Sequence, residues 1–200
     1  MGKLKVGILA SHGGSNAQAI MDQARAGEIN AEVAVLISNN ANAQALERAE
    51  AAGVPHEIVN ATRYPGEGEE DRKLVEILRA RGVELVVLAG YMKKLGPAML
   101  DAFRGRIVNV HPALLPKHGG KGKYGIHVHE SVIASGDTET GVSVHIVDKQ
   151  YDHGPILGQT VVPVEPGDTP ETLQKRVLAV EHRLYPEVIG KIASGEIKLG

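Results

Sequence analysis

The sequence predicts an α/β protein of a single domain, with a mostly parallel, doubly wound sheet, an antiparallel strand near the C-terminus and a final helix. Three observations predict this class. Apolar, β-branched runs alternate with segments of helical period through the first half of the chain. The early runs are continuously apolar, which is typical of parallel strands covered on both faces. A length of 200 residues fits one domain with a full core.

In the first half, predicted strands and helices follow one another in strict order. The predicted strands are residues 5–10, 31–38, 55–59, 84–90 and 106–110. The predicted helices between them are residues 16–26, 43–52 and 69–81. Between the last two strands we expect only a short turn. This alternation is the pattern of βαβ units, in which a helix joins two parallel strands.

The second half departs from this pattern after Val110. Residues 112–130 are rich in Pro and Gly and predict a long loop, and a short helix is expected at 129–134. Residues 141–148 and 156–164 predict two strands of an antiparallel pair, joined by a tight connection.

The last predicted helix covers residues 170–193. It begins with a proline at its first position, Thr169 is the expected N-cap, and Glu171 lies in the first turn. Pro186 lies inside it, and we expect this residue to kink or split the helix near Tyr185 because proline lacks the backbone N–H that the helix needs.

Composition and charge narrow the function classes. The 42% hydrophobic and 23% charged fractions are those of an ordinary globular protein. A net charge of −2 argues against the basic surface that nucleic-acid binding requires, so we expect no nucleic-acid partner. The absence of cysteine excludes disulfides and a thiolate nucleophile. The N-terminal apolar run is too short for a signal peptide or a membrane span, so we expect a cytoplasmic protein without a membrane partner.

The stretch ASHGGSN follows the first predicted strand and opens the first helix. At this place in an open α/β sheet a phosphate can meet backbone N–H groups and the positive end of a helix. Gly13 and Gly14 would allow a close approach, and Ser15 and Asn16 could add side-chain donors. An ordinary turn followed by an N-cap at Ser15 explains the stretch equally well.

Asn109 and His111 lie two positions apart in a predicted strand, before Pro112. Residues two apart point to the same side of a strand, so the amide and the imidazole can converge at its carboxyl end. An amide donor beside an imidazole can stabilise an oxyanion and move a proton, as acyl transfer requires. The alternative is a core histidine and an asparagine that caps a turn.

Asp152 lies in the predicted connection YDHGP, next to His153. A carboxylate beside a histidine raises the pKa of the imidazole, fixes its tautomer and can relay a proton through water. The same residues are also common in turns without any catalytic role.

Six of the nine histidines fall between His111 and His153. His127 and His129, two apart in an extended segment, could offer two nitrogen ligands on one side. The sequence contains no defined metal-ligand spacing such as HExxH, so we expect no catalytic metal.

Five motifs occur together in this order: GGSN, LAGYMKKL, NVHPALLPKHGG, GVSVHIVD and YDHGPI. With them, about residues 5–195 of the sequence resemble phosphoribosylglycinamide formyltransferases, a branch of the folate-dependent formyltransferases. The resemblance implies one domain over residues 1–200 with a Rossmann-like formyltransferase fold. It also implies a phosphate-binding N-terminal half, about 1–105, and a folate-binding, catalytic C-terminal half, about 106–200.

The resemblance further implies the reaction and its catalytic residues. The amine of glycinamide ribonucleotide would attack the formyl carbon of 10-formyltetrahydrofolate, the cosubstrate, in purine biosynthesis, with no metal. His111 as imidazolium and Asn109 as amide donor would stabilise the tetrahedral oxyanion. Asp152 would support the charged His111 and take part in water-mediated proton transfer.

The remaining site residues are implied in the same way. Gly14, Ser15 and Asn16 would bind the substrate phosphate, and Glu181 would contact the ribonucleotide. The folate pocket would include Met92, Lys93, Leu95, Val142 and Asp148. Supporting positions around the catalytic residues would be His145, Ser143, His127 and His129.

Two other functions are compatible with the motifs. A formyltransferase could act on another amine, such as an aminosugar nucleotide, if the phosphate at residues 14–16 is recognised together with a larger sugar. A non-catalytic module that binds a nucleotide or a folate would use Asn109 and His111 only structurally. A homodimer is a further possibility that no motif decides.

Overall fold

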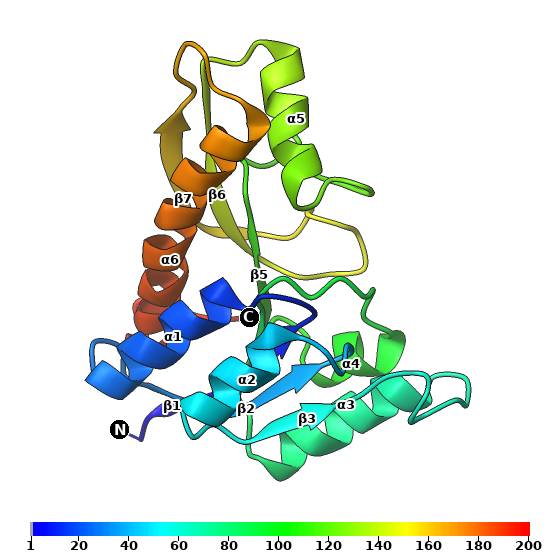
Figure 1. Cartoon of the computed structure of the whole chain (residues 1–200). Coiled ribbons are helices and arrows are strands. Elements are labelled where there is room, and N and C mark those ends of the chain that lie inside the picture. The colour runs from blue at the N-terminus through cyan, green and yellow to red at the C-terminus, as the bar shows by residue number, and fades with distance from the viewer. Residues whose placement is uncertain (1) are drawn as a thin grey trace.

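A seven-stranded sheet runs through the structure, which is a computed structural model describing residues 2–200. The strand order is β3-β2-β1-β4-β5-β6-β7 (Figure 1). The strands are β1 Leu4–Ala10, β2 Ala31–Ser38, β3 His56–Ile58, β4 Leu85–Leu88, β5 Ile107–His111, β6 Glu139–Ile146 and β7 Ile156–Pro163. The helices are α1 Ser15–Ala26, α2 Gln44–Ala51, α3 Glu69–Ala80, α4 Pro97–Ala102, α5 Ile126–Ser135 and α6 Pro170–Ser194.

The strand directions confirm the predicted fold class. Strands β1 to β5 run parallel to one another, whereas β6 runs antiparallel to both β5 and β7. The chain moves outward from β1 to β3 and then returns to place β4 on the other side of β1. The loops after β1 and β4 therefore leave the sheet in opposite directions, and the crevice between them is the usual ligand site of such sheets.

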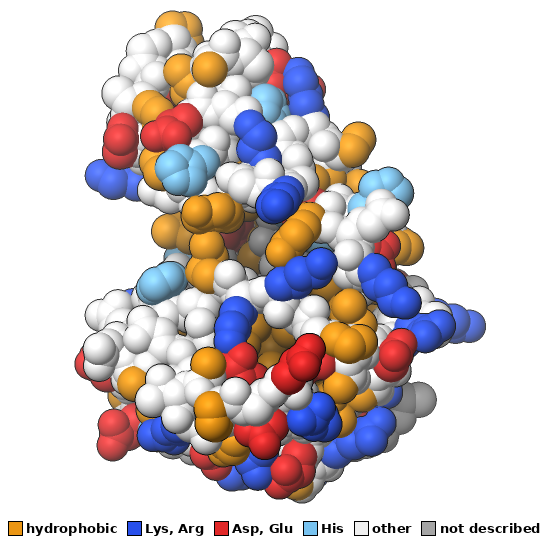
Figure 2. Space-filling model, turned by 90° about the vertical axis from the view of Figure 1, so that its right-hand side faces the viewer, with side chains coloured by type: hydrophobic (Ala, Val, Ile, Leu, Met, Phe, Trp, Pro, Cys, Tyr) orange, Lys and Arg blue, Asp and Glu red, His pale blue; other side chains and the backbone are white. Residues whose placement is uncertain are grey.

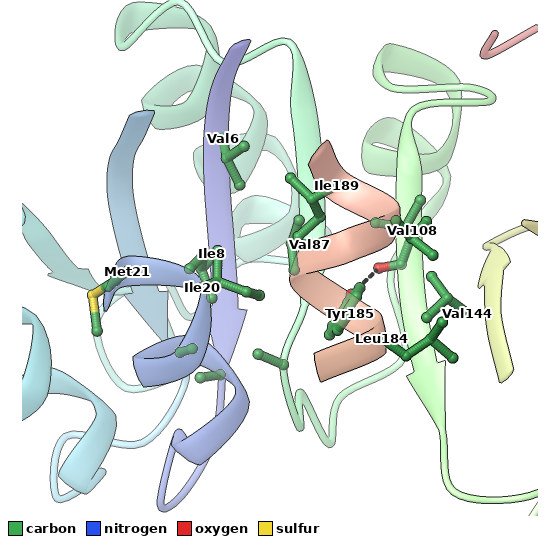
Figure 3. Close-up of a cluster of buried hydrophobic side chains, with 14 of the residues drawn as sticks. Val6, Ile8, Ile20, Met21, Val87, Val108, Val144, Leu184, Tyr185 and Ile189 are labelled. Atoms are coloured by element: carbon green, nitrogen blue, oxygen red, sulfur yellow. Dashed lines mark hydrogen bonds between the residues drawn. The ribbon is translucent and has the colours of Figure 1, made fainter. Parts of the chain in front are cut away.

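Helices cover both faces of the sheet. Buried side chains of α1, α2, α5 and α6 pack on one face, and those of α3 and α4 pack on the other. The close-up in Figure 3 shows the first of these clusters, where Tyr185 and Ile189 of α6 meet Val87 and Val108 of the sheet. The continuously apolar strands follow from this arrangement because both of their faces are covered.

Three predictions about single elements are wrong. A helix, α4, stands where only a turn was expected. It begins there because the Asp71 carboxylate of α3 accepts the backbone N–H groups of Gly96, Ala98 and Met99, a cap contributed from far away in the sequence. Helix α5 begins three residues before the predicted start, at Ile126. The β6–β7 connection is the long segment 147–155 rather than a tight turn.

Helix α6 begins at Pro170 as predicted and ends at Ser194, one residue after the predicted end. Thr169 caps it, and Thr172 completes a reciprocal capping box. The expected split at Pro186 is wrong, because the helix continues through this residue to Ser194. Pro186 is buried, and its neighbours Leu184, Tyr185, Val188 and Ile189 pack in the hydrophobic cluster, so tertiary packing holds the helix together across the missing hydrogen bond.

Within residues 2–200, no helix combines the length and the apolar character needed to cross a membrane.

Candidate active site

The loops after β1, β2 and β4 are tied together at the carboxyl ends of these strands. The Ser11 N–H donates to the Gly90 carbonyl at 3.1 Å. The Ser11 hydroxyl donates to the Asn39 side-chain oxygen at 2.6 Å and accepts the Met92 N–H at 2.8 Å. One buried serine thus fixes the spacing between the glycine loop and the segment that follows β4.

The glycine loop opens helix α1 in a left-handed conformation. Gly14 is the N-cap with φ 68°, and no side chain caps the helix, so the alternative of an N-cap at Ser15 is wrong. A Cβ atom at Gly14 would lie 2.6 Å from the Cβ of Ala45 in α2. The first helical hydrogen bond is donated by Gln18 to Gly14. The N–H groups at residues 15–17 therefore have no acceptor in the helix and can bind an anion.

Asn16 and Glu181 meet although they lie at opposite ends of the chain. The Asn16 amide donates to the Glu181 carboxyl at 2.5 Å. Burial raises the pKa of Glu181 to about 7, against the opposing effect of the Asn16 hydrogen bond. Both residues were predicted on the ribonucleotide side, and the structure brings them together. Arg48, which the sequence analysis missed, donates to the Gly13 carbonyl at 2.7 Å and adds a positive charge beside this loop.

The three predicted catalytic residues converge where β5 ends. Asn109 and His111 lie on β5, and Asp152 comes from the loop between β6 and β7. The His111 Nδ1 lies 3.7 Å from an Asp152 carboxylate oxygen. His145 of β6 is the cross-strand partner of Asn109 on β5, and it lies between Asn109 and Asp152. Its Nε2 is 3.2 Å from the Asn109 amide nitrogen and 3.5 Å from the second Asp152 oxygen.

His111 is almost completely buried, and one ring nitrogen has a fixed partner. Its Nε2–H donates to the His118 carbonyl at 3.0 Å, which leaves Nδ1 facing Asp152. Burial lowers the pKa of His111, and the attraction of Asp152 does not compensate. The free site therefore favours the neutral imidazole rather than the imidazolium that the resemblance implied. Burial, and to a smaller degree the repulsion that a protonated His111 would exert, lowers the pKa of His129 to about 4.

Asp152 is held in an uncommon backbone conformation. Its φ is 55°, in the left-handed region, and its carboxylate accepts the Gly120 N–H at 2.9 Å. Burial by itself would raise the pKa of Asp152, but His145, His111 and the Gly120 N–H together lower it. The carboxylate is thus kept charged next to a neutral imidazole.

A pocket opens beside these residues, and three of the predicted folate residues line it. Lys93, Leu95 and Asp148 share its wall with Asn109, His145 and Asp152. The face seen in Figure 2 is hollowed at mid-height, with Lys and Arg side chains around the hollow. Lys93 is ion-paired with Glu70 of α3. Other lining residues lie in or next to the same motifs: Tyr91 and Lys94 belong to LAGYMKKL, Lys149 follows GVSVHIVD and Tyr151 begins YDHGPI, and the sequence analysis singled out neither Tyr91 nor Lys94.

Two other predicted folate residues lie outside the pocket wall. Met92 is 46% exposed and contributes its backbone N–H to Ser11. Val142 is fully buried in the hydrophobic cluster under α6, so its predicted place in the pocket is wrong. Alternation along β6 explains the difference: positions 143 and 145 share one face, and position 142 points to the other.

The supporting positions take different places. The Ser143 hydroxyl donates to the Ala113 carbonyl at 2.6 Å and accepts the Leu115 N–H at 2.9 Å, so it holds the loop after β5. His127 and His129 lie in the first turn of α5 rather than in an extended segment, and they do not point to one side. His127 is exposed and pairs with Glu130 at 2.9 Å. Among residues 2–200, no group of three or more acidic, His or Cys residues is placed to hold a metal ion.

Comparison with known proteins gives the class to which this fold and site belong. A family described as formyl transferase matches residues 4–189, so the chain belongs to the formyl transferase family. It is 38% identical over 196 residues to phosphoribosylglycinamide formyltransferase of Escherichia coli K12, covering 98% of this chain and 90% of that protein.

Two further similarities concern named members of this family. The chloroplastic phosphoribosylglycinamide formyltransferase of Arabidopsis thaliana is 44% identical over 97% of this chain, which spans 67% of that protein. The crystal structure of glycinamide ribonucleotide transformylase 1 from Symbiobacterium toebii superimposes with a TM-score of 0.92 at 43% identity, covering 99% of this chain and 91% of that one.

Proposed function

We propose that this protein transfers the formyl group of 10-formyltetrahydrofolate to the amine of glycinamide ribonucleotide. The products are formylglycinamide ribonucleotide and tetrahydrofolate, in de novo purine biosynthesis. The observation that carries the proposal is the convergence of three residues: Asn109 and Asp152 line one pocket, and the His111 Nδ1 lies 3.7 Å from the Asp152 carboxylate. The names of the relatives from Escherichia coli and Arabidopsis thaliana support the choice of acceptor.

The chemistry follows from the residues in this wall. The acceptor nitrogen forms a bond to the formyl carbon, and the bond from that carbon to N10 of the folate breaks. Negative charge develops on the formyl oxygen, where the Asn109 N–H and a protonated His111 would stabilise it. In the free site, burial disfavours protonation of His111. The negative charge that develops on the formyl oxygen favours this protonation. Asp152, 3.7 Å from His111, stabilises the imidazolium so formed.

The proton balance assigns a second task to the carboxylate. The amine loses one proton when it attacks, and N10 of the leaving folate gains one. Asp152 is charged and accepts only the Gly120 N–H from the backbone, so it can relay this proton through water. No metal is needed for these steps.

The two substrates would approach from different sides of the catalytic residues. The α1 N-terminus at Gly14, Ser15 and Asn16 binds the phosphate, and Glu181 contacts the ribonucleotide beside Asn16. The folate lies in the pocket with Lys93, Leu95 and Asp148. Each of the two proposed binding sites combines residues from both halves of the chain. The proposed division at about residue 105 therefore divides the sequence, but it does not assign one substrate to each half.

The test is an assay of formyl transfer with purified protein. The protein is mixed with 10-formyltetrahydrofolate, or a deazafolate analogue, and with glycinamide ribonucleotide, while the folate absorbance is followed. Turnover that depends on this amine supports the proposal. Turnover only with an aminosugar nucleotide would contradict the acceptor, and folate binding without turnover on any amine would indicate a non-catalytic module. The cytoplasmic location stays a prediction, and the homodimer stays a possibility that no observation decides.

A further inference from the structure

A polar cluster that the catalytic scheme does not use joins the loop between β5 and α5 to α5 and to the residues just after it. It consists of His118, Ser131 and Asp137 with two lysines, Lys117 and Lys123. The His118 Nε2–H donates to the Asp137 carboxylate at 2.7 Å, and the His118 Nδ1 lies 3.0 Å from the Ser131 hydroxyl. Only 9% of the His118 side chain is exposed. A histidine with both ring nitrogens engaged has one fixed orientation.

The donors and acceptors in this cluster form one continuous chain. Lys123 donates to the Ser131 hydroxyl oxygen at 2.7 Å, which leaves the Ser131 hydrogen free to bond the His118 Nδ1. At the other end, Lys117 donates to Asp137 at 2.5 Å. Hydrogen bonds with Lys117 and His118 lower the pKa of Asp137 to about 2, so its carboxylate is charged at every physiological pH. The groups that face His118 are thus Asp137, Lys117 and Lys123, with His111 on the side of the site.

The backbone next to this cluster contacts both His111 and Asp152. The His118 carbonyl accepts the Nε2–H of His111, and the Gly120 N–H donates to Asp152. Between them, Gly119 passes so close that a Cβ atom there would lie 3.2 Å from the Cβ of Asp152. One short turn, residues 118–120, therefore sets the position of the imidazole and of the carboxylate at once.

This turn is not in a relaxed conformation. His118 and Asp152 are the two non-glycine residues with positive φ within residues 2–200, at 56° and 55°. The left-handed region is unfavourable for residues with a Cβ atom, so surrounding contacts must hold it. The side chain of His118 supplies such contacts with Ser131 of α5 and with Asp137, which follows α5.

We propose that His118 and Asp137 are a positioning pair, which fastens the 118–120 turn to the end of α5 and thereby fixes the tautomer of His111 and its contact with Asp152. The inference deepens the proposed function and rests on it for its kinetic consequence. His118 and Asp137 touch no reacting atom in this scheme. They act through the His118 carbonyl and the Gly120 N–H.

The experiment compares Asp137→Ala and His118→Gly with the wild-type protein. Glu130→Ala is the matched control, because Glu130 forms a histidine–carboxylate pair with His127 in α5 whose side chains are about half exposed, 54% and 53%. The His111 tautomer is measured by ¹H–¹⁵N correlation of the imidazole, and kcat and KM by formyl transfer. His118→Gly also removes the strain of the positive φ, so it tests the pair if Asp137→Ala fails to fold.

The expected result is a fixed Nε2–H tautomer of His111 in the wild type and in Glu130→Ala, and a mixture of tautomers in the other two variants. Their kcat should fall by about 10- to 100-fold, with smaller changes of KM, because a small misplacement of a reacting group has effects of this size. An unchanged tautomer in both variants overturns the inference, even if kcat falls. If the wild type fails to transfer formyl groups, the proposed function fails, but the tautomer measurement still decides on the positioning pair.

Discussion

The proposed phosphate end of this site, at the start of α1, and its proposed catalytic end, where β5 ends, are built in different ways. The phosphate end uses neighbours in the sequence, Gly14 to Asn16, at the start of one helix, and a glycine takes the left-handed conformation. The catalytic end gathers β5, β6, the 118–120 turn and the loop of Asp152, and non-glycine residues take that conformation. Anion binding needs only a helix terminus, whereas proton transfer needs side chains with fixed tautomers and pKa values, which only tertiary contacts supply.

The largest expected effect lies at the catalytic end. His111→Ala should lower kcat for formyl transfer by about 10²- to 10⁴-fold, because a group that donates or accepts a proton in the transition state has effects of this size. His56→Ala, at an exposed histidine of the edge strand β3, should leave kcat unchanged. Steady-state kinetics with the circular dichroism spectrum of each variant decides the matter, and a His111→Ala enzyme within threefold of the wild type would contradict the assignment.

The second prediction concerns the phosphate end and its pH dependence. The pKa of Glu181 is about 7 in the folded protein against an ordinary value of 4.5. Folding stability from this raised pKa is fully present below about pH 4.5 and is lost as the pH rises through about 7, a change of about 3 kcal/mol. Glu181→Gln, which stays neutral, should remove this change. Urea unfolding at pH 5 and pH 8 measures it, and an equal decrease in both proteins would show that Glu181 is not its source.

A smaller effect, on the free energy of unfolding, distinguishes Gly14 from Gly13 in the loop before α1. Gly14→Ala should lower the free energy of unfolding by about 2 kcal/mol, because φ is 68° and the new Cβ would crowd Ala45. Gly13→Ala is the control, since its Cβ would have Gln44 as nearest neighbour at 3.9 Å. Thermal and urea unfolding of both variants test this difference. Equal losses would mean that the loop adapts to a side chain at either position.

The smallest effect, on the free energy of unfolding, is expected at Tyr185 of α6, which contacts the backbone of the chain beside both ends of the site. The buried Tyr185 hydroxyl of α6 lies 3.0 and 2.9 Å from the carbonyl oxygens of Leu88 and Val108, at the end of β4 and in β5, and its one hydrogen is shared between them. Figure 3 shows Tyr185 beside Val108. Tyr185→Phe should cost about 1 kcal/mol of stability through this lost hydrogen bond. Tyr124→Phe, at a side chain that is 51% exposed, should cost nothing measurable. Urea unfolding would contradict this if both variants were equally stable.

Much of the phosphate end could be predicted from the sequence, because its features are local. The strand, the two glycines and the helix start are adjacent in the chain, so their order alone indicates an anion site. The partner of Asn16 could not be predicted from local pattern, because Glu181 lies 165 residues away and the resemblance alone supplied it. Helix α4 was missed for the same reason, since its cap, Asp71, belongs to another helix.

At the catalytic end, the sequence predicts which side chains come together, but it does not predict the protonation state and the tautomer that their surroundings impose. The two-residue spacing of Asn109 and His111 places both on one side of β5, as the structure has them. The neutral state of His111 depends on burial, and its tautomer depends on a backbone carbonyl, neither of which a sequence motif shows. The error at Val142 was avoidable, because strand alternation already places it opposite His145.

The central claim is that His111 and Asp152 act as one unit, and a double-variant cycle of kcat/KM for formyl transfer tests it most directly. The cycle compares His111→Ala, Asp152→Asn and the double variant with the wild type. If the carboxylate acts through the imidazole, the double variant should be no slower than the slower single variant. Losses that multiply in the double variant would show that the two groups act independently, which would contradict the account.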